Sequence, residues 1–427
     1  MTPPPTPRDD YERRTATSRA RHREAAAYLP GGDSRAATYH EPYPSYARHA
    51  RACTLTTVDG DRLLDFHNNY TQTVLGHAPP TVVEAVTDRF AAGNGLGMPT
   101  TEITALARRL VERVPSLETV RFTNSGTEAT MNAIRVAMAH TDREGVLKVF
   151  GGYHGSHDTV EVHVDAPGRS HRGIPADVES RVWSVPYNDP EALVDAFAEH
   201  GDDLACFVVE PVLGAAGMVP ATTEYLRTAR DLADDHGVPL VFDETISFRL
   251  DLGGAQRRYG VTPDLTALGK VIGGGLPVGA FGGRAELLAL THPGDGPVSH
   301  TGTFNANPAT MAGGVATLDR LDEAAIDRLN RLGEDFRTRL DALETPGPVQ
   351  VTGDGSLFQV HLTDEAVTDK ATSTAGADDL LDLYFALRAE GVYLAPRGTG
   401  SLSTPMTTDD LDDALEAFRA AFDRLEA

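Results

Sequence analysis

Helical and strand patterns alternate along the middle of the chain. Apolar side chains recur every three or four residues at 103–114 and at 226–233, which predicts amphipathic helices, the second ended by Gly237. Between such helices stand short runs that are apolar throughout. They are 146–150, 204–209 and 238–242. Continuous apolar strands between helices predict an α/β fold whose sheet is mostly parallel and buried on both faces.

The two ends of the chain follow other patterns. A polar arm and a helix are predicted for residues 1 to about 30, where Pro30, Gly31 and Gly32 end the helix. Alternation over 53–66 predicts a β-hairpin. After residue 325 we expect helix, strand and helix, the last running from Leu411 to Leu425. The predicted domains are an N-terminal segment of residues 1–75 that joins the small domain, a large domain of 76–325, and a small α+β domain of 326–427.

Composition excludes several classes of protein. Hydrophobic residues make up 41% of the 427 residues and charged residues 23%, as in ordinary globular proteins. No apolar run reaches the ~18 residues of a membrane span, and the Pro-rich start lacks the apolar core of a secretory signal. The two cysteines, Cys53 and Cys206, have no metal-ligand spacing and fit a reducing compartment. We therefore expect a cytoplasmic protein with no metal and no membrane partner.

Charge narrows the choice of partners further. The formal net charge is −24, which repels nucleic acid and anionic membranes. The chain has only three lysines, and the other 35 of its 38 basic residues are arginines. Two explanations fit these numbers: adaptation to a salty cytoplasm, with a halophilic-like acidic surface, or a GC-rich genome that favours arginine codons.

Small and hydroxyl side chains stand where a helix is predicted to begin. Ser125, Gly126 and Thr127 follow a strand pattern and precede a helical one. Free backbone N–H groups and the helix dipole at such a start suit a phosphate group. The alternative is an ordinary capping box formed by Ser125 and Glu128.

Aromatic and acidic residues follow three further strands. Tyr153 and His154 stand in a Gly-rich turn, which would let an aromatic ring lie flat on a planar ligand, or would simply be a turn with a packed Tyr. Glu210 and Asp243 each end an apolar strand. Two such carboxylates suit a metal, acid–base catalysis or a cationic ring, and each alone could equally be a solvated strand end.

Lys270 lies between apolar residues and a glycine run. Burial lowers the pKa of a lysine and makes its amine a nucleophile toward carbonyls. The lysine precedes the glycines, so the segment is not a Walker phosphate loop. Phosphate loop, aromatic ring, carboxylate and lysine, in this order, are the groups needed to hold pyridoxal 5′-phosphate.

These motifs resemble the class III (subgroup II) aminotransferases of pyridoxal-phosphate fold type I. The resemblance covers about residue 25 to the end. Its motifs are SGTEA at 125–129, GGYHG at 151–155, EP at 210–211, DE at 243–244, LGKVIGGGLPVGAFGG at 268–283 and HTGTFNANP at 300–308. The sequence is similar to the branch that contains glutamate-1-semialdehyde aminomutase, and within it most similar to β-phenylalanine aminotransferases. The fold implied is a large domain with a mostly parallel sheet between helices and a smaller α+β domain.

The resemblance implies roles for these residues. Lys270 would bind the cofactor as a Schiff base and carry a proton, and Asp243 would keep the ring nitrogen protonated. The phosphate would bind Ser125, Gly126 and Thr127, with Tyr153 and His154 at the ring and Glu210 near its phenolic side. Thr303 matches the position that reaches the phosphate of the neighbouring subunit, which implies a homodimer with shared sites. The remaining two residues, Arg35 and Arg397, match arginine-bearing motifs of β-phenylalanine aminotransferases and would bind a substrate carboxylate.

Three departures from the aminomutases shape the functional prediction. The gating loop of that family is replaced at 165–173. The Asn expected after the Glu-Pro motif is replaced at 213–216, and the segment that carries a functional Glu is replaced at 398–401. A mutase must retain its diamino intermediate, so these changes favour release of a keto product. We therefore expect a ping-pong aminotransferase that moves the amino group of a β-amino acid to a keto acid such as 2-oxoglutarate. The alternatives are a glutamate-1-semialdehyde 2,1-aminomutase, a decarboxylase or epimerase with the same cofactor, and a non-catalytic cofactor-binding protein.

Overall fold

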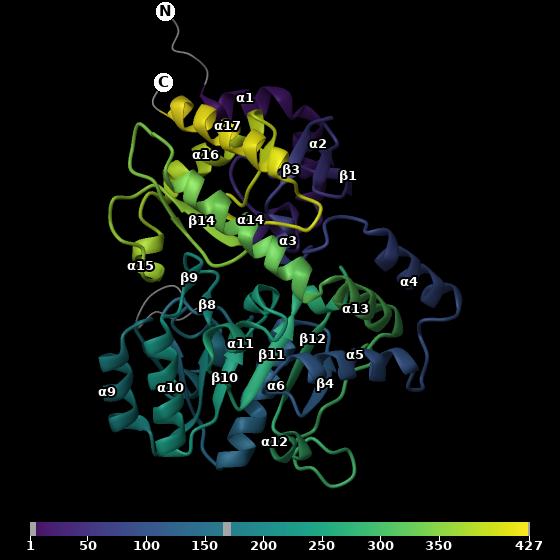
Figure 1. Ribbon diagram of the computed structural model, residues 1–427, viewed down its shortest axis with the longest axis vertical. Coiled ribbons are helices and arrows are strands. Elements are labelled where there is room, and N and C mark those ends of the chain that lie inside the picture. Colours follow the sequence, from purple (N-terminus) through teal and green to yellow (C-terminus); the bar gives the residue numbers. More distant parts are fainter. Residues whose placement is uncertain (1–5, 165–171, 426–427) are drawn as a thin grey trace, which may run out of the picture.

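A seven-stranded mixed sheet forms the centre of the larger part of the molecule (Figure 1). The computed structural model describes residues 6–164 and 172–425. Strand order is β4-β12-β11-β10-β7-β5-β6, and β12 alone among these strands runs antiparallel to its neighbours. The strands are β4 (Thr119–Thr123), β5 (Gly145–Val149), β6 (Val182–Val185), β7 (Leu204–Val209), β10 (Leu240–Asp243), β11 (Leu265–Gly269) and β12 (Gly279–Gly283). The predicted α/β class with a mostly parallel sheet is confirmed.

Side chains of the central strands point alternately to the two faces of this sheet. On β7, Cys206 and Val208 pack on α6 (Gly126–Thr141), whereas Phe207 and Val209 pack toward α9 (Pro190–His200) and α10 (Thr223–His236). Burial on both faces is the reason that these strands are apolar throughout. Further helices cover the edge at β4 and the remaining surface. They are α4 (Pro80–Ala91), α5 (Thr101–Arg113), α7 (Asp158–Glu161), α8 (Ala176–Glu179), α11 (Ala255–Tyr259), α12 (Ala285–Ala289) and α13 (Pro308–Arg320).

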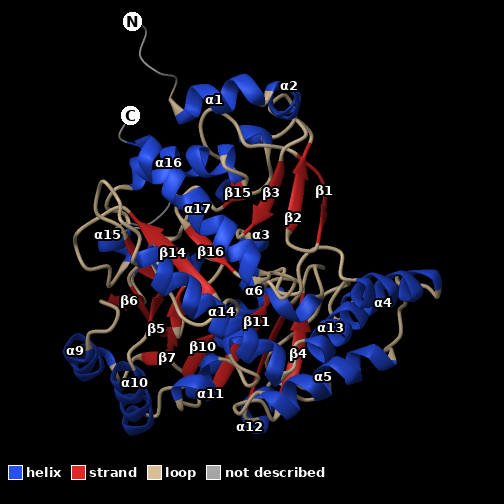
Figure 2. Ribbon diagram, turned by 45° about the horizontal axis from the view of Figure 1, so that its top comes forward, coloured by secondary structure: helices blue, strands red, loops and turns tan. Residues whose placement is uncertain are grey.

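The N-terminal and C-terminal segments share a second sheet. Strand β15 (Val392–Tyr393) pairs in parallel with β3 (Arg62–Asp65), next to β2 (Thr54–Thr57) and β1 (Ala47–Arg51). Figure 2 shows these strands beside the helices that carry both chain ends, α1 (Pro7–Arg14), α2 (Ala16–Ala25) and α17 (Thr408–Leu425). The predicted hairpin is present as β2 and β3, but its polar neighbour β1 was not predicted.

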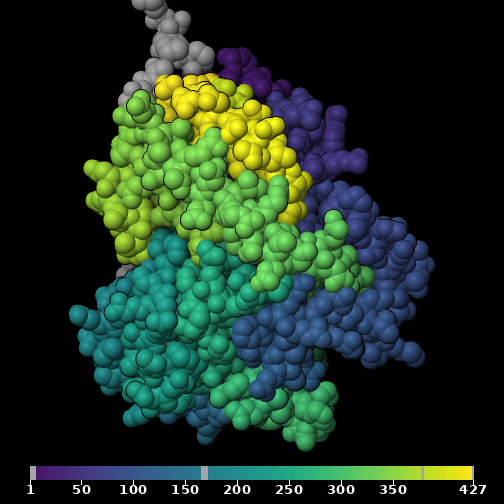
Figure 3. Space-filling view, viewed as in Figure 1, coloured from purple at the N-terminus to yellow at the C-terminus, as the bar shows by residue number. Residues whose placement is uncertain are grey.

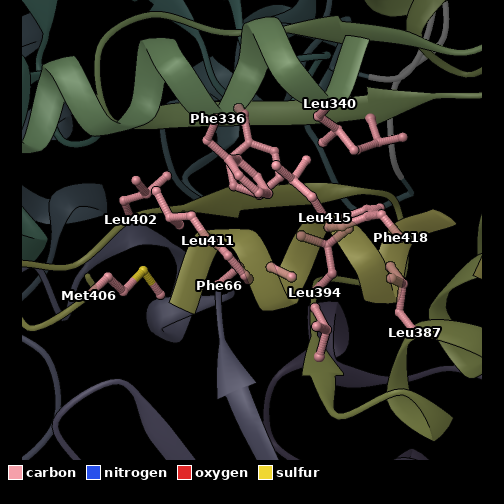
Figure 4. Close-up of a cluster of buried hydrophobic side chains, with 14 of the residues drawn as sticks. Phe66, Phe336, Leu340, Leu387, Leu394, Leu402, Met406, Leu411, Leu415 and Phe418 are labelled. Carbon is pink, nitrogen blue, oxygen red and sulfur yellow. The ribbon is translucent and has the colours of Figure 1, made fainter. Parts of the chain in front are cut away.

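A third sheet and two long helices complete the smaller part. Strands β13 (Gln350–Thr352), β14 (Leu357–His361) and β16 (Thr399–Ser401) pair antiparallel. Strand β14 shares a hydrophobic core with α14 (Glu323–Asp341) and α16 (Ala377–Ala389). Figure 4 shows their shared core, in which Phe336 stacks on Phe66 with ring centroids 5.1 Å apart. The core thus joins residues more than 250 positions apart in the sequence, and Figure 3 shows the purple and yellow ends of the chain in contact. Smaller elements are α3 (Asn68–Thr71), β8 (Val212–Leu213), β9 (Val219–Pro220) and α15 (Lys370–Ser373).

In the described part of the chain, no helix has both the length and the apolar character that crossing a bilayer requires.

Candidate active site

Residues at the carboxyl ends of the central strands line one cavity of about 440 Å³. This is the edge at which open parallel sheets bind ligands. Asp243 ends β10, Lys270 follows β11, Glu210 follows β7, and the turn with Tyr153 follows β5. Eight of the predicted site residues line this cavity: Arg35, Gly126, Thr127, Tyr153, His154, Glu210, Asp243 and Lys270.

Asp243 is held by two hydrogen bonds at the floor of the cavity. Nδ1 of His154 donates to its Oδ2 at 3.1 Å, and the backbone N–H of Thr245 donates to its Oδ1 at 3.0 Å. Burial acts to raise the pKa of Asp243, but the bonds from His154 and Thr245 prevail and hold it below its usual value. Asp243 therefore stays ionised, which suits it to bind a cationic N–H group.

Glu210 has the opposite electrostatic character. Its carboxyl oxygens accept the backbone N–H groups of Tyr153 at 3.0 Å and Gly214 at 3.1 Å. Burial, followed by the charge of Asp243, raises the pKa of Glu210 to about 8. Two neighbouring carboxyls are thus driven apart in pKa, a pattern typical of functional sites. Glu210 also fixes the backbone of Tyr153, which is 46% exposed and lines the cavity.

Lys270 begins a short 3₁₀ turn directly after β11. Its φ is +47°, a left-handed conformation that is uncommon for residues other than glycine. Burial lowers the pKa of the Lys270 amine, and the carboxylates of Asp243 and Glu210 partly oppose this effect. A larger fraction of neutral amine makes Lys270 a better nucleophile toward an aldehyde.

The start of α6 combines a cap with a possible anion site. The Ser125 hydroxyl accepts the N–H of Glu128 at 3.1 Å, while the Glu128 carboxylate accepts the N–H of Asn124 at 2.6 Å. The amides of Gly126 and Thr127 have no carbonyl within their own helix to bind, and both residues line the cavity. A Cβ at Gly155 would lie 2.4 Å from Oγ1 of Thr127, so glycine is needed for this close approach.

Three predicted residues do not line the cavity. Ser125 caps α6 from the side, and Thr303 stands on an exposed loop before α13. Arg397 is exposed between β15 and β16, although its charge acts on the pKa of Tyr70 and Tyr153. Arg35 does line the cavity, and its Nη1 donates to Oδ1 of Asn69 at 2.9 Å.

Some lining residues were absent from the predicted site. Thr245 follows Asp243 by two positions, and its buried Oγ1 has no hydrogen-bond partner in the structure. Its place in the sequence, just after the strand end, could have identified it. Asn69 lines the cavity from α3, beside Tyr70, where four successive residues have positive φ. Only the Asn-Asn pair hints at this in the sequence, because asparagine tolerates left-handed backbone.

Comparison with known proteins identifies the family. Residues 36–422 match the family model for "Aminotransferase class-III". The chain belongs to the class III aminotransferases. A curated relative in this family, from Methanobrevibacter smithii, is named glutamate-1-semialdehyde 2,1-aminomutase. It is 38% identical over 94% of this chain and 96% of its own.

Two solved transaminase structures have the same fold. The omega-transaminase from Sphaerobacter thermophilus is 40% identical with a TM-score of 0.94, covering 98% of this chain and all of the other. A transaminase with bound pyridoxal phosphate is 35% identical with a TM-score of 0.90, covering 96% of this chain and 98% of the other. The predicted cofactor is confirmed: this chain is a pyridoxal-phosphate-dependent enzyme of class III.

The cavity residues fit this cofactor. An ionised carboxylate at Asp243 suits the ring N–H, the Tyr153 ring suits the ring face, and the start of α6 suits the phosphate. The buried, unpaired hydroxyl of Thr245 is a further polar atom that a ligand could satisfy. Within the described ranges, no group of three His, Cys, Asp or Glu side chains is placed to hold a metal ion.

The predicted β-amino acid aminotransferase is contradicted by the relatives. Full-length relatives at 36–41% identity are named glutamate-1-semialdehyde 2,1-aminomutase, which favours the alternative. Two of the three sequence departures have structural roles here. Gly214 serves to bind Glu210, and 399–401 form strand β16. Most of the replaced loop, residues 165–171, lies outside the described residues.

Proposed function

We propose that this chain is a glutamate-1-semialdehyde 2,1-aminomutase, an isomerase. The observation that carries the proposal is the near-complete similarity to relatives of that name, which cover 94–97% of this chain at 36–41% identity in several cases. As that name states, the amino group moves between adjacent carbons. The substrate 4-amino-5-oxopentanoate becomes 5-amino-4-oxopentanoate, and no atoms are gained or lost.

The cavity suits a substrate with one carboxylate. Among the described residues, Arg35 is the one arginine that lines the cavity, and its guanidinium is oriented by a hydrogen bond to Asn69. A guanidinium binds a carboxylate with two parallel hydrogen bonds, which would fix the end of the substrate that does not react. An enzyme that cycles through 2-oxoglutarate must bind a second carboxylate as well. One lining arginine therefore favours the isomerisation of a monocarboxylate.

The remaining residues have complementary roles in this proposal. Bound pyridoxal phosphate supplies an electron-accepting ring and a carbonyl carbon that exchanges amines. Lys270 Nζ takes the proton from one substrate carbon and returns it at the neighbouring position. The Asp243 carboxylate accepts the ring N–H, and the Gly126 and Thr127 amides hold the phosphate. Glu210 positions Tyr153 through its backbone N–H, at 3.0 Å.

Isomerisation without a second substrate is the decisive test. The holoenzyme is incubated with 4-amino-5-oxopentanoate in the absence of any keto acid, and 5-amino-4-oxopentanoate is quantified by chromatography. We expect near-stoichiometric conversion whose rate does not change when 2-oxoglutarate is added. If no 5-amino-4-oxopentanoate forms, and added 2-oxoglutarate instead yields 4,5-dioxopentanoate and glutamate in equal amounts, the proposal is overturned in favour of amino transfer.

We further propose a cytoplasmic homodimer. Thr303 lies outside the cavity of its own chain, on an exposed loop beside the exposed side chain of Phe304. This position agrees with a role in the site of a second copy. Both cysteines are unpaired and buried, as in proteins of reducing compartments. Light scattering should give twice the chain mass, and Thr303→Ala should weaken cofactor binding without changing that mass.

A further inference from the structure

Arg249 is a fully buried cation without an acidic partner. It lies in a 3₁₀ turn (Ser247–Leu250) six residues after Asp243, and its side chain is among the largest fully buried ones. Across the described residues, no carboxylate pairs with it. Burial lowers the pKa of Arg249 to about 9. A buried, unpaired charge is costly, so an arginine retained here calls for a specific role.

The Arg249 guanidinium instead bonds to neutral oxygens on three segments. Nη1 donates to the carbonyl of Thr71 at 2.8 Å, and Nε donates to the Ser356 hydroxyl at 3.0 Å. Nη2 donates to the carbonyl of Leu402. Thr71 belongs to α3, Ser356 precedes β14, and Leu402 follows β16. One side chain thus ties the segment after Asp243 to three segments of the smaller part, and Figure 1 places α3 at this boundary.

The backbone that Arg249 binds is strained. Asn68, Asn69, Tyr70 and Thr71 have φ of +48°, +48°, +58° and +72°, so α3 is a left-handed turn of residues other than glycine. Thr71 is the least suited of the four, because its Cβ is branched and its buried hydroxyl has no hydrogen-bond partner in the structure. Such backbone persists only where its surroundings hold it in place, and it clusters at functional sites.

Different contacts hold the two ends of the turn, and at its last residue the backbone N–H of Thr71 donates to the His67 carbonyl at 3.2 Å. The Asn68 N–H donates to Oδ1 of Asp65 at 2.9 Å, and its Nδ2 donates to the Ser401 carbonyl at 2.7 Å. At the other end, the side-chain bond to the Thr71 carbonyl comes from Arg249. Between these ends, Asn69 and Tyr70 enter the cavity, and Asn69 accepts the bond from Arg35.

We propose that Arg249 is a positioning residue for the substrate side of the cavity: its guanidinium holds the left-handed turn at Thr71 and thereby places Asn69, Tyr70 and Arg35. An arginine is required because its planar fork bonds three oxygens in fixed directions, which a lysine cannot do. The inference deepens the proposed function in that it names what orients the substrate carboxylate. It concerns residues that neither bind the cofactor nor transfer protons.

The test uses a variant that removes the need for the arginine. Glycine adopts positive φ without steric cost, so Thr71→Gly should relax the turn. The holoenzymes of wild type, Arg249→Lys, Thr71→Gly and the double variant Arg249→Lys/Thr71→Gly are compared. Arg249→Met is made as well, and Arg249→Lys keeps the experiment informative if Arg249→Met does not fold.

Two readouts separate positioning from general stability. We expect Arg249→Lys to raise KM for 4-amino-5-oxopentanoate by roughly 10- to 100-fold with a much smaller change in kcat, because the substrate-binding residues are displaced while Lys270 and Asp243 are not. We expect amide hydrogen exchange of residues 66–73, measured without substrate, to accelerate by about tenfold. Adding Thr71→Gly should restore most of both quantities.

Failure of this inference is distinguishable from failure of the proposed function. If wild type does not isomerise 4-amino-5-oxopentanoate, the proposed function fails, and the exchange rates still decide the role of Arg249. Unchanged exchange at 66–73 in Arg249→Lys would overturn the inference. If Arg249→Lys lowers kcat by the same factor by which it raises KM, and Thr71→Gly restores neither, Arg249 serves only general stability.

Discussion

At the scale of single residues, Lys270 is expected to be indispensable. Replacing it with alanine removes both the amine that binds the cofactor and the base that moves the proton, so turnover should fall at least ~10²- to 10⁴-fold. Borohydride reduction followed by mass spectrometry should show covalent cofactor on wild type and none on Lys270→Ala. Lys370→Ala is a control, since Lys370, on α15, is not among the residues that line the cavity. Covalent cofactor on Lys270→Ala would refute the assignment.

Glu210 should make the stability of the cofactor-free protein depend on pH. Its pKa is about 8 in the folded protein and 4.5 in an unfolded chain. Between these values only the folded protein binds this proton, so stability should fall as pH rises through this window. Glutamine cannot ionise, so the stability of Glu210→Gln should fall less than that of wild type between about pH 5 and 8. The difference between the two losses should be on the order of a few kcal/mol. Thermal unfolding at several pH values measures this; Glu334→Gln, at an exposed position of α14, is the control. Parallel curves for wild type and Glu210→Gln would contradict the assigned pKa.

Residues that follow strands could be predicted from the sequence, and others could not. Asp243, Glu210 and Lys270 line one cavity because parallel strands place their carboxyl ends together, which order along the chain reveals. Their roles stay predictions until variants are measured. Arg249 gave no signal, because it is one of 35 arginines and its burial depends on segments that only the fold brings together.

At the scale of secondary structure, the start of α6 should serve both the fold and the cofactor. Ser125→Ala removes the hydroxyl that accepts the backbone N–H of Glu128 at the start of α6, and this loss should cost about 0.5–2 kcal/mol of stability. The matched control is Thr222→Ala, since the Thr222 hydroxyl caps α10 through the N–H of Tyr225 in the same way at 3.1 Å. Both variants should lose similar stability in denaturant titrations. Only Ser125→Ala should raise the Kd for pyridoxal phosphate, and equal Kd values would show that the Ser125 hydroxyl does not help to hold the phosphate.

Elements were predictable where burial dictates composition. The apolar runs are strands β5, β7 and β10, and the periodic segments are α5, α10 and α17. Strand β12 was not predicted, because its glycines suggest a loop. They are required by packing: a Cβ at Gly279 would lie 2.0 Å from the Ser125 carbonyl oxygen. The left-handed α3 was likewise unpredictable, since tertiary contacts at both of its ends stabilise it.

At the scale of the whole molecule, the ends of the chain depend on each other. Strand β15 near the C-terminus pairs with β3 near the N-terminus, and Phe66 packs among residues of α14 and β14. These contacts support the proposal that 1–75 and 326–427 form one unit beside the large domain of 76–325. The spacing of polar and apolar residues in these two segments could not predict the pairing of β3 with β15. Such spacing shows which face of an element is buried, but not which other element packs against that face.

Net charge should govern how the whole molecule responds to salt. At −24, self-repulsion opposes the compact state, and the Debye length shrinks to ~3 Å at 1 M salt. Salt also weakens exposed ion pairs such as Arg339–Asp412, at 2.6 Å, but each such pair contributes only ~0–1 kcal/mol. If the acidic excess is salt adaptation, Tm should rise by several degrees between dilute buffer and about 1 M KCl, equally in NaCl, because screening does not depend on the ion. Full stability in dilute buffer would reject salt adaptation. It would leave codon preference as the explanation for the excess of arginine over lysine, a substitution that does not alter net charge.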